Sequence, residues 1–144
     1  MNGYQCYTKR TIDVLPLEVV TAKQYNYNLG IKLIRGAYMN EERELATKGN
    51  YESPVWDTIE DTHKCYNQNM EHIIKNMSKN DMLFVASHNV DTIELAKRLV
   101  VENDLKSANC VRFGQLRGFS DQVTGGLAAE GFRVYKYVPF GPTE

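Results

Sequence analysis

The chain has 144 residues, of which 42% are hydrophobic and 24% charged, and its formal net charge is −1. These values suit a globular domain with its own core, or part of a larger one. The charge is balanced and forms no basic arm, which argues against a nucleic-acid partner, and no apolar run approaches the roughly 18 residues that span a bilayer.

The first half of the chain predicts two strands and three helices. An apolar run at 4–8 is read as a strand, and the pattern over 17–30 is helical and stops at Gly30. A second strand is expected at 31–36. After it we expect a short helix within 40–49 and a longer one over 58–77, in which His63 and His72 lie on the solvated side.

The second half continues the alternation of strands and helices. A strand at 82–88 leads to a helix over 91–105 that starts at an acidic cap, Asp91. A strand at 110–116 leads to a helix over 120–131, capped by Ser120 and weakened by Gly125 and Gly126. A last strand is expected at 133–139.

Strands that alternate with helices in this way indicate a parallel α/β sheet. A doubly wound open sheet fits the length, but no glycine-rich G-x-G-x-x-G turn follows a strand. A (βα)₈ barrel is the second possibility. Five strands cannot close a barrel, so that reading implies that the chain is a fragment.

The ends of the predicted strands are rich in polar side chains. One polar residue at a strand end is usually a turn or a cap, but five successive strands that end this way predict a shared ligand site. The side chains at these ends are Gln5, Tyr7, Lys32, Arg35, Ser87, His88, Asn89, Gln115, Arg117, Lys136 and Tyr137.

The same residues are poor in acids, bases and nucleophiles. The three histidines share no metal-ligand spacing, so we expect no metal. Three cysteines without paired spacing favour a reducing compartment over a disulfide framework. A site of cations, amides and aromatic rings suits a cofactor that does its own chemistry, and a cation at Lys32 or Arg35 would stabilise a reduced flavin.

Five motifs in this order and spacing closely resemble the proline dehydrogenase family in its eukaryotic mitochondrial form. They are YQCY (4–7), IKLIRGAY (31–38), ASHN (86–89), RFGQLRGFSDQ (112–122) and VYKYVPFGP (134–142). The resemblance covers essentially the whole chain. It implies that residues 1–144 are one partial domain, strands four to eight of a (βα)₈ TIM-type barrel.

The resemblance also implies a reaction and its surroundings. The family oxidises L-proline to Δ¹-pyrroline-5-carboxylate by hydride transfer to N5 of FAD, and the electrons pass to a quinone at a membrane. It implies a mitochondrial location, on the matrix face of the inner membrane. The N-terminal residues MNGYQCYTKR carry neither a signal-peptide nor a transit-peptide pattern, so we expect no targeting segment on this chain.

Roles for individual residues follow from the motifs that they occupy. Lys32 falls where bacterial members carry an arginine beside flavin N5, and Tyr137 matches a tyrosine that packs on bound proline, so these two are the expected catalytic residues. Leu33 and Tyr38 are expected to line the substrate pocket with Tyr137. The residues expected to bind FAD are Gln5, Lys32, Arg35, Gly36, Ala37, Ser87, His88, Asn89 and Gln115.

The chain also departs from the family pattern. The family clamps the substrate carboxylate with two arginines on the helix after strand eight, and it uses a lysine and an aspartate from early strands. This sequence contains neither set, so we expect it to be inactive alone. One alternative is a degenerate paralogue that keeps the scaffold without catalysis. Another is an unrelated α/β binding module, which Gln5 and Tyr7 disfavour because they stand where such a module would have acids.

Overall fold

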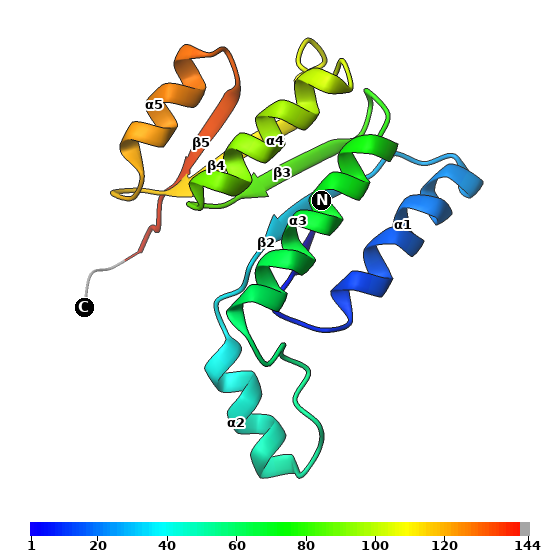
Figure 1. The fold of residues 1–144 in the computed structure, drawn as a ribbon, viewed down its shortest axis with the longest axis vertical. Helices are drawn as coiled ribbons and strands as arrows, with labels where there is room; N and C mark the ends of the chain where they lie inside the picture. The colour runs from blue at the N-terminus through cyan, green and yellow to red at the C-terminus, as the bar shows by residue number, and fades with distance from the viewer. Residues whose placement is uncertain (142–144) are drawn as a thin grey trace.

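Five parallel strands form one sheet, and their order in the sheet is their order in the chain (Figure 1). The computed structural model describes residues 1–141. The strands are β1 (Asn2–Gln5), β2 (Gly30–Ile34), β3 (Met82–Ala86), β4 (Val111–Leu116) and β5 (Arg133–Tyr137). All five predicted strands are therefore present, although most end earlier than expected.

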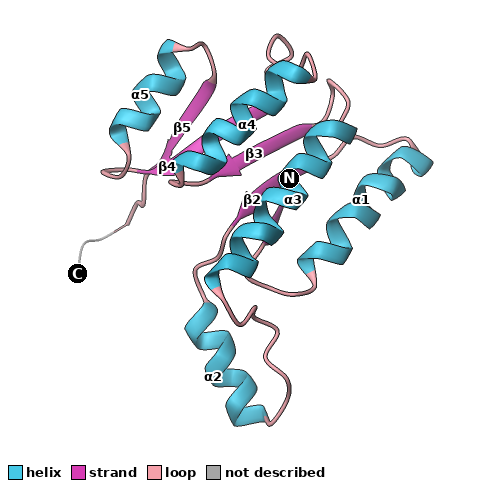
Figure 2. Cartoon of the chain, in the orientation of Figure 1, coloured by secondary structure: helices cyan, strands magenta, loops and turns pink. Residues whose placement is uncertain are grey.

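Five helices accompany the strands. They are α1 (Thr11–Tyr25), α2 (Met39–Gly49), α3 (Ile59–Asn76), α4 (Val90–Glu102) and α5 (Asp121–Ala129). Figure 2 shows α1, α3, α4 and α5 on one side of the sheet, whereas α2 projects beyond the end of β2. None of the helices within residues 1–141 is long and apolar enough to cross a membrane.

This arrangement decides between the two architectures. A doubly wound sheet reverses its strand order at a switch point and carries helices on both faces. Here the order runs β1-β2-β3-β4-β5 without reversal, and the helices cover one face. The sheet is therefore an arc of a barrel, and the doubly wound alternative is wrong.

The core lies between the sheet and its helices. Along β2 the side chains alternate, as they must in a strand. Ile31 and Leu33 are 1% and 0% exposed beneath the helices, whereas Lys32 and Ile34 are half-buried on the opposite, concave face. The concave face thus receives the side chains that the core does not use.

The structure corrects three expected helix boundaries. The first helix ends at Tyr25, where Asn26 takes a left-handed conformation, and Gly30 instead begins β2. Helix α4 is capped by Asn89, whose side chain accepts from the Thr92 amide, and not by Asp91. Ser120 precedes α5 with φ +53° and makes no capping bond, because a cap needs an extended backbone to aim its oxygen at the first amides.

The turn after β2 requires a glycine. Gly36 has φ +144°, and a Cβ at this position would overlap the buried ring of Tyr7. Beyond the turn the chain runs out through α2. The chain then returns to the end of β1. There the Trp56 amide donates to the Tyr7 carbonyl at 2.9 Å, and the Lys9 amide donates to the Pro54 carbonyl at 2.8 Å. At the outgoing end the Tyr7 amide donates to the Arg35 carbonyl at 2.7 Å, so the segment that follows β2 is held at both ends beside the carboxyl end of β1.

Candidate active site

A cleft of about 820 Å³ opens on the concave face of the sheet, at the carboxyl ends of the strands. Parallel strands bring these ends to one edge, which is where α/β folds place their ligands. Besides the residues that the sequence singled out, the cleft is lined by Ile34, His63, Phe84, Ala86, Gly114, Leu116 and Tyr135.

Of the strand-end side chains to which no motif role was assigned, Lys136 lines the cleft, whereas Tyr7 and Arg117 do not. The cleft brings together all but one of the twelve residues to which the motifs assign a role. Those that line it are Gln5, Lys32, Arg35, Gly36, Ala37, Tyr38, Ser87, His88, Asn89, Gln115 and Tyr137. The exception is Leu33, which is 0% exposed and faces the helices. Because Leu33 is flanked by Lys32 and Ile34 in a strand of period two, it cannot share their face, and Ile34 lines the cleft in its place.

Lys32 supplies a positive charge near the middle of the cleft. Its Nζ lies 5.8 Å from the centroid of the Tyr137 ring and 6.0 Å from that of Phe84. Within residues 1–141 no carboxylate lies close enough to form an ion pair with it. The ammonium is therefore held among aromatic rings with its hydrogen-bonding capacity free for a ligand.

Gln5 lines the cleft from the end of β1. Its backbone carbonyl accepts bonds from the Thr8 and Thr11 hydroxyls at 2.8 and 2.7 Å, which fix the end of this strand. Its side-chain Oε1 is buried and has no hydrogen-bond partner among the residues that the structure describes. An orphaned buried amide oxygen is costly unless a ligand donates to it.

Arg35 ties the end of β2 to two helices and to the end of β3. Its Nε donates to His63 Nδ1 at 2.9 Å, Nη1 to Ser87 Oγ at 2.7 Å and Nη2 to Thr92 Oγ1 at 2.7 Å. The guanidinium lies 4.3 Å from the ring centroid of the fully buried Tyr66. Burial lowers the pKa of Arg35.

Three of the five Arg35 N–H groups are therefore occupied by the protein itself. The expectation that Arg35 contacts the cofactor remains a prediction, carried by the two remaining N–H groups.

Ser87 presents a hydroxyl at the end of β3. Its Oγ accepts from Arg35 and also from the Asn89 amide at 3.1 Å. Both lone pairs are then used, so the hydroxyl proton is free to donate, and within residues 1–141 no acceptor takes it. Asn89 itself is occupied as the cap of α4.

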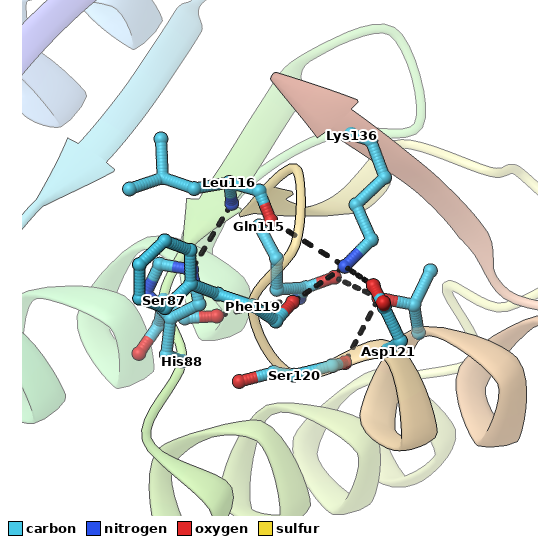
Figure 3. Close-up of polar contacts among 9 residues, drawn as sticks. Ser87, His88, Gln115, Leu116, Phe119, Ser120, Asp121 and Lys136 are labelled. Carbon is cyan, nitrogen blue, oxygen red and sulfur yellow. Dashed lines mark hydrogen bonds and ion pairs between the residues drawn. The ribbon is translucent and has the colours of Figure 1, made fainter. Parts of the chain in front are cut away.

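His88, Gln115 and Lys136 form a polar cluster at the ends of β3, β4 and β5, in which each is hydrogen-bonded to neighbouring residues (Figure 3). His88 Nε2 accepts from the Leu116 amide at 3.0 Å. Lys136 Nζ donates to the Phe119 carbonyl at 2.5 Å and pairs with Asp121 at 2.6 Å. Burial, and then the charge of Lys136, lower the pKa of His88.

Gln115 is almost wholly enclosed in this cluster, with 2% of its surface exposed. Its Nε2 donates to the Ser87 carbonyl at 3.3 Å, and its Oε1 accepts from the Thr124 hydroxyl at 3.0 Å. Both ends of the amide are thus used to join β3, β4 and α5. A contact between Gln115 and the cofactor remains a prediction.

Sequence reasoning missed several residues of the cleft. His63 was expected on the solvated side of its helix, but it is half-buried and accepts the bond from Arg35. His72 is also half-buried, with its Nε2 enclosed. Phe84 and Tyr135 could have been found, because strand periodicity places Phe84 on the face of Ala86 and Tyr135 on that of Tyr137.

The electrostatics of the cleft favour an electron-rich ligand. Among the described residues that line it there is no Asp or Glu, whereas Lys32, Arg35 and Lys136 contribute cations. Free donors from Lys32 and Ser87 and the orphaned amide of Gln5 fit a group such as FAD, which carries phosphates, carbonyls and a ring N–H. No cluster of His, Cys, Asp or Glu within residues 1–141 could hold a metal ion.

The chain has relatives among known proteins. A family model described as "Proline dehydrogenase" matches residues 1–144. The human protein named "Proline dehydrogenase 1, mitochondrial" is 40% identical over 144 aligned positions, gaps included, and the alignment covers 98% of this chain and 24% of that protein. A Xenopus laevis protein named "Hydroxyproline dehydrogenase" is 35% identical over 147 aligned positions, gaps included, and the alignment covers 99% of this chain and 32% of that protein.

The fold is also found among solved structures. The crystal structure of proline utilization A (PutA) from Bdellovibrio bacteriovorus, inactivated by N-propargylglycine, superimposes with a TM-score of 0.87 at 21% identity. The match covers 96% of this chain and 14% of that one. The proline dehydrogenase domains of such proteins have a TIM-barrel-like fold, of which this chain is a part. The chain spans about a quarter of the length of the human relative.

Proposed function

The chain belongs to the proline dehydrogenase family, and from this we propose that it forms the flavin-facing part of a site that oxidises L-proline to Δ¹-pyrroline-5-carboxylate. The main support is the composition of the cleft, where free donors and an orphaned amide surround about 820 Å³ that no carboxylate lines within the described residues. Such a surface binds an electron-rich cofactor and leaves the redox chemistry to it.

Binding of FAD would involve the ends of three strands. When bound, FAD would accept the hydride that leaves C5 of proline. Gln5 would hydrogen-bond the flavin from β1, Lys32 from β2, and Ser87 with His88 from β3, while Gly36 and Ala37 let the backbone come close to the cofactor. The Lys32 ammonium, held among aromatic rings, would stabilise negative charge that gathers next to it.

The substrate would lie against the aromatic side chains of the cleft. Tyr137 is 61% exposed at the end of β5, and Tyr38 is 59% exposed just after β2. Both therefore have free ring surface for an apolar pyrrolidine. No acid–base residue is needed if proline enters as its free amine, because the ring nitrogen then drives the hydride from the adjacent carbon.

We further propose that this activity belongs to a longer protein. The sheet has two open edges, β1 and β5, and each has one neighbour. A closed barrel needs eight strands. Relatives that are named mitochondrial support a location in mitochondria, where a membrane quinone would take the electrons from FAD.

A chimera tests the proposal directly. The 144 residues would replace the matching segment of the human relative, to which they are 40% identical. We expect the purified chimera to carry FAD, and its flavin absorption to bleach when L-proline is added without oxygen. When the 144-residue chain by itself is mixed with FAD, L-proline should not bleach the flavin absorption.

Other outcomes separate the alternatives. A folded chimera that stays colourless would mean that these residues have lost the cofactor site, as in a degenerate paralogue. A chimera that binds FAD but bleaches with trans-4-hydroxy-L-proline and not with proline would overturn the proposed substrate. Bleaching by the chain alone would contradict the need for a longer protein.

A further inference from the structure

We propose that the Leu116 amide holds His88 in its Nδ1–H tautomer, so that His88 acts as a hydrogen-bond donor to an acceptor atom of the bound cofactor. The identity of the ligand rests on the proposed function. The tautomer itself rests on the fold alone. A histidine side chain free in water favours the other tautomer, with the proton on Nε2, so the structure imposes a definite choice here.

The hydrogen-bond ladder between β3 and β4 is interrupted just after Ser87. The Ser87 amide donates to the Gly114 carbonyl at 3.2 Å, as a parallel ladder requires. The next rung would join the Leu116 amide to the Ser87 carbonyl. Instead, that carbonyl accepts from Gln115 Nε2 at 3.3 Å, and the Leu116 amide donates to His88 Nε2 at 3.0 Å.

The chemistry of imidazole then determines which nitrogen of His88 carries the proton. A backbone N–H always donates, so the nitrogen that receives it must offer a lone pair and cannot carry a proton. A neutral imidazole then has its proton on Nδ1. Within residues 1–141 no acceptor takes this Nδ1–H, and His88 lines the cleft. The unused donor is therefore available to a ligand.

Lys136, Asp121 and Phe119 hold this geometry. Lys136 reaches from β5 to the turn after β4. Its Nζ donates there to the Phe119 and Leu116 carbonyls at 2.5 and 3.5 Å (Figure 3). It pairs there with Asp121, so that Leu116 is fixed opposite His88. The Phe119 ring packs against the imidazole with centroids 5.8 Å apart.

The charges around His88 also favour the neutral ring. Lys136 faces it from β5, the Asp121 carboxylate is already paired with Lys136, and Arg35, just after β2, reaches the neighbouring Ser87. Protonation of Nε2 would place a donor against the Leu116 amide and a second cation beside Lys136. The lowered pKa of His88 agrees with this.

The decisive measurement is the histidine tautomer by nitrogen NMR. Long-range ¹H–¹⁵N spectra of the ¹⁵N-histidine-labelled chain, and of the chimera, would be recorded at pH 8 without flavin. The His88 signals are those that disappear in the His88→Gln variant. We expect a protonated Nδ1 and an unprotonated Nε2. A proton on Nε2, or rapid exchange between both tautomers, would overturn the proposal.

Two variants distinguish the acceptor role of His88 Nε2 from the donor role of Nδ1. Glutamine can keep an acceptor near the Leu116 amide but has no donor at the position of Nδ1. Asparagine can supply a donor near Nδ1 but does not reach Leu116. We expect His88→Gln to keep the urea midpoint of the parent and to lose FAD affinity by about tenfold, which is the effect of one hydrogen bond. We expect His88→Asn to lower the urea midpoint.

The measurements also separate this inference from the proposed function. If the NMR shows the Nδ1–H tautomer but the chimera binds no FAD, the cofactor assignment fails and the tautomer assignment stands. If FAD binds and His88→Gln binds it as tightly as the parent, His88 is not the donor and the inference fails.

Discussion

At the scale of single residues, Arg35 shows how a strand end can serve structure and site together. A cation and a glycine follow a hydrophobic strand here, and the cation turns back to bind three side chains from three other elements. Because Ser87 is one of these partners, the guanidinium also orients a hydroxyl of the cleft. Its planar fork is suited to this in a way that a lysine is not.

We expect Arg35→Lys to lower the free energy of unfolding by about 2 kcal/mol, because an ammonium cannot reach all three acceptors and leaves buried groups unpaired. Urea unfolding followed by circular dichroism measures the change. Arg98→Lys is the matched control, since Arg98 lies exposed on α4 and pairs loosely with Glu102 at 3.7 Å. Equal stability of the two variants would contradict the tying role of Arg35.

Lys32 carries the second prediction at this scale. In the chimera, Lys32→Met should raise the activation free energy of flavin reduction by about 2 to 4 kcal/mol, because one preorganised charge next to the reacting group is lost. FAD content should change much less. Stopped-flow bleaching with L-proline measures the rate, and Lys32→Arg, which keeps the cation, should recover most of it. An unchanged rate in Lys32→Met would rule out this role.

At the scale of elements, two glycines show why the same residue type has different uses. Gly36 turns the chain at the end of β2 with φ +144°, above the ring of Tyr7. Gly125 lies inside α5, and a Cβ there would meet nothing within 4 Å. The first glycine is needed by the geometry of the cleft, whereas the second costs α5 some of its stability.

We therefore expect opposite effects from two identical substitutions. Gly125→Ala should raise the free energy of unfolding by about 0.5 to 1 kcal/mol through helix propensity. Gly36→Ala should lower it by at least about 2 kcal/mol, since it combines an unfavourable φ with an overlap. Urea midpoints of the two variants against the parent test this. A stable Gly36→Ala variant would mean that the turn can be remodelled.

At the scale of the whole molecule, the open sheet determines how the chain behaves alone. Strands β1 and β5 are both edges, and the concave face leaves Tyr135 and Tyr137 43% and 61% exposed. Open edges and uncovered aromatic rings favour association with other chains.

We expect the isolated 144-residue chain to bind the apolar dye ANS and to sediment as a mixture of species. The chimera, in which the remaining strands cover these surfaces, should do neither to the same extent. Dye fluorescence and analytical ultracentrifugation at matched concentrations make the comparison. A monodisperse chain that does not bind the dye would show that five strands form a self-sufficient unit.

Much of this molecule follows from local pattern. The five strands and their parallel direction were predictable, because apolar runs separated by helices leave few other topologies. Eleven of the twelve expected site residues line one cleft, because parallel strands bring their carboxyl ends to a single edge. The error at Leu33 arose from reading a motif as a block, where strand periodicity sends alternate residues to opposite faces.

The sequence by itself thus determined the order of the elements, the edge at which the cleft forms and the family. Only the tertiary structure decided which polar groups remain free there. Gln115 and most of Arg35 are occupied by the protein, whereas among residues 1–141 no partner takes the Lys32 ammonium, Gln5 Oε1, the Ser87 hydroxyl proton or His88 Nδ1. The reason is physical. Hydrogen-bond partners such as His63 and Thr124 lie on other elements than Arg35 and Gln115, and no local sequence pattern predicts that these side chains come into contact.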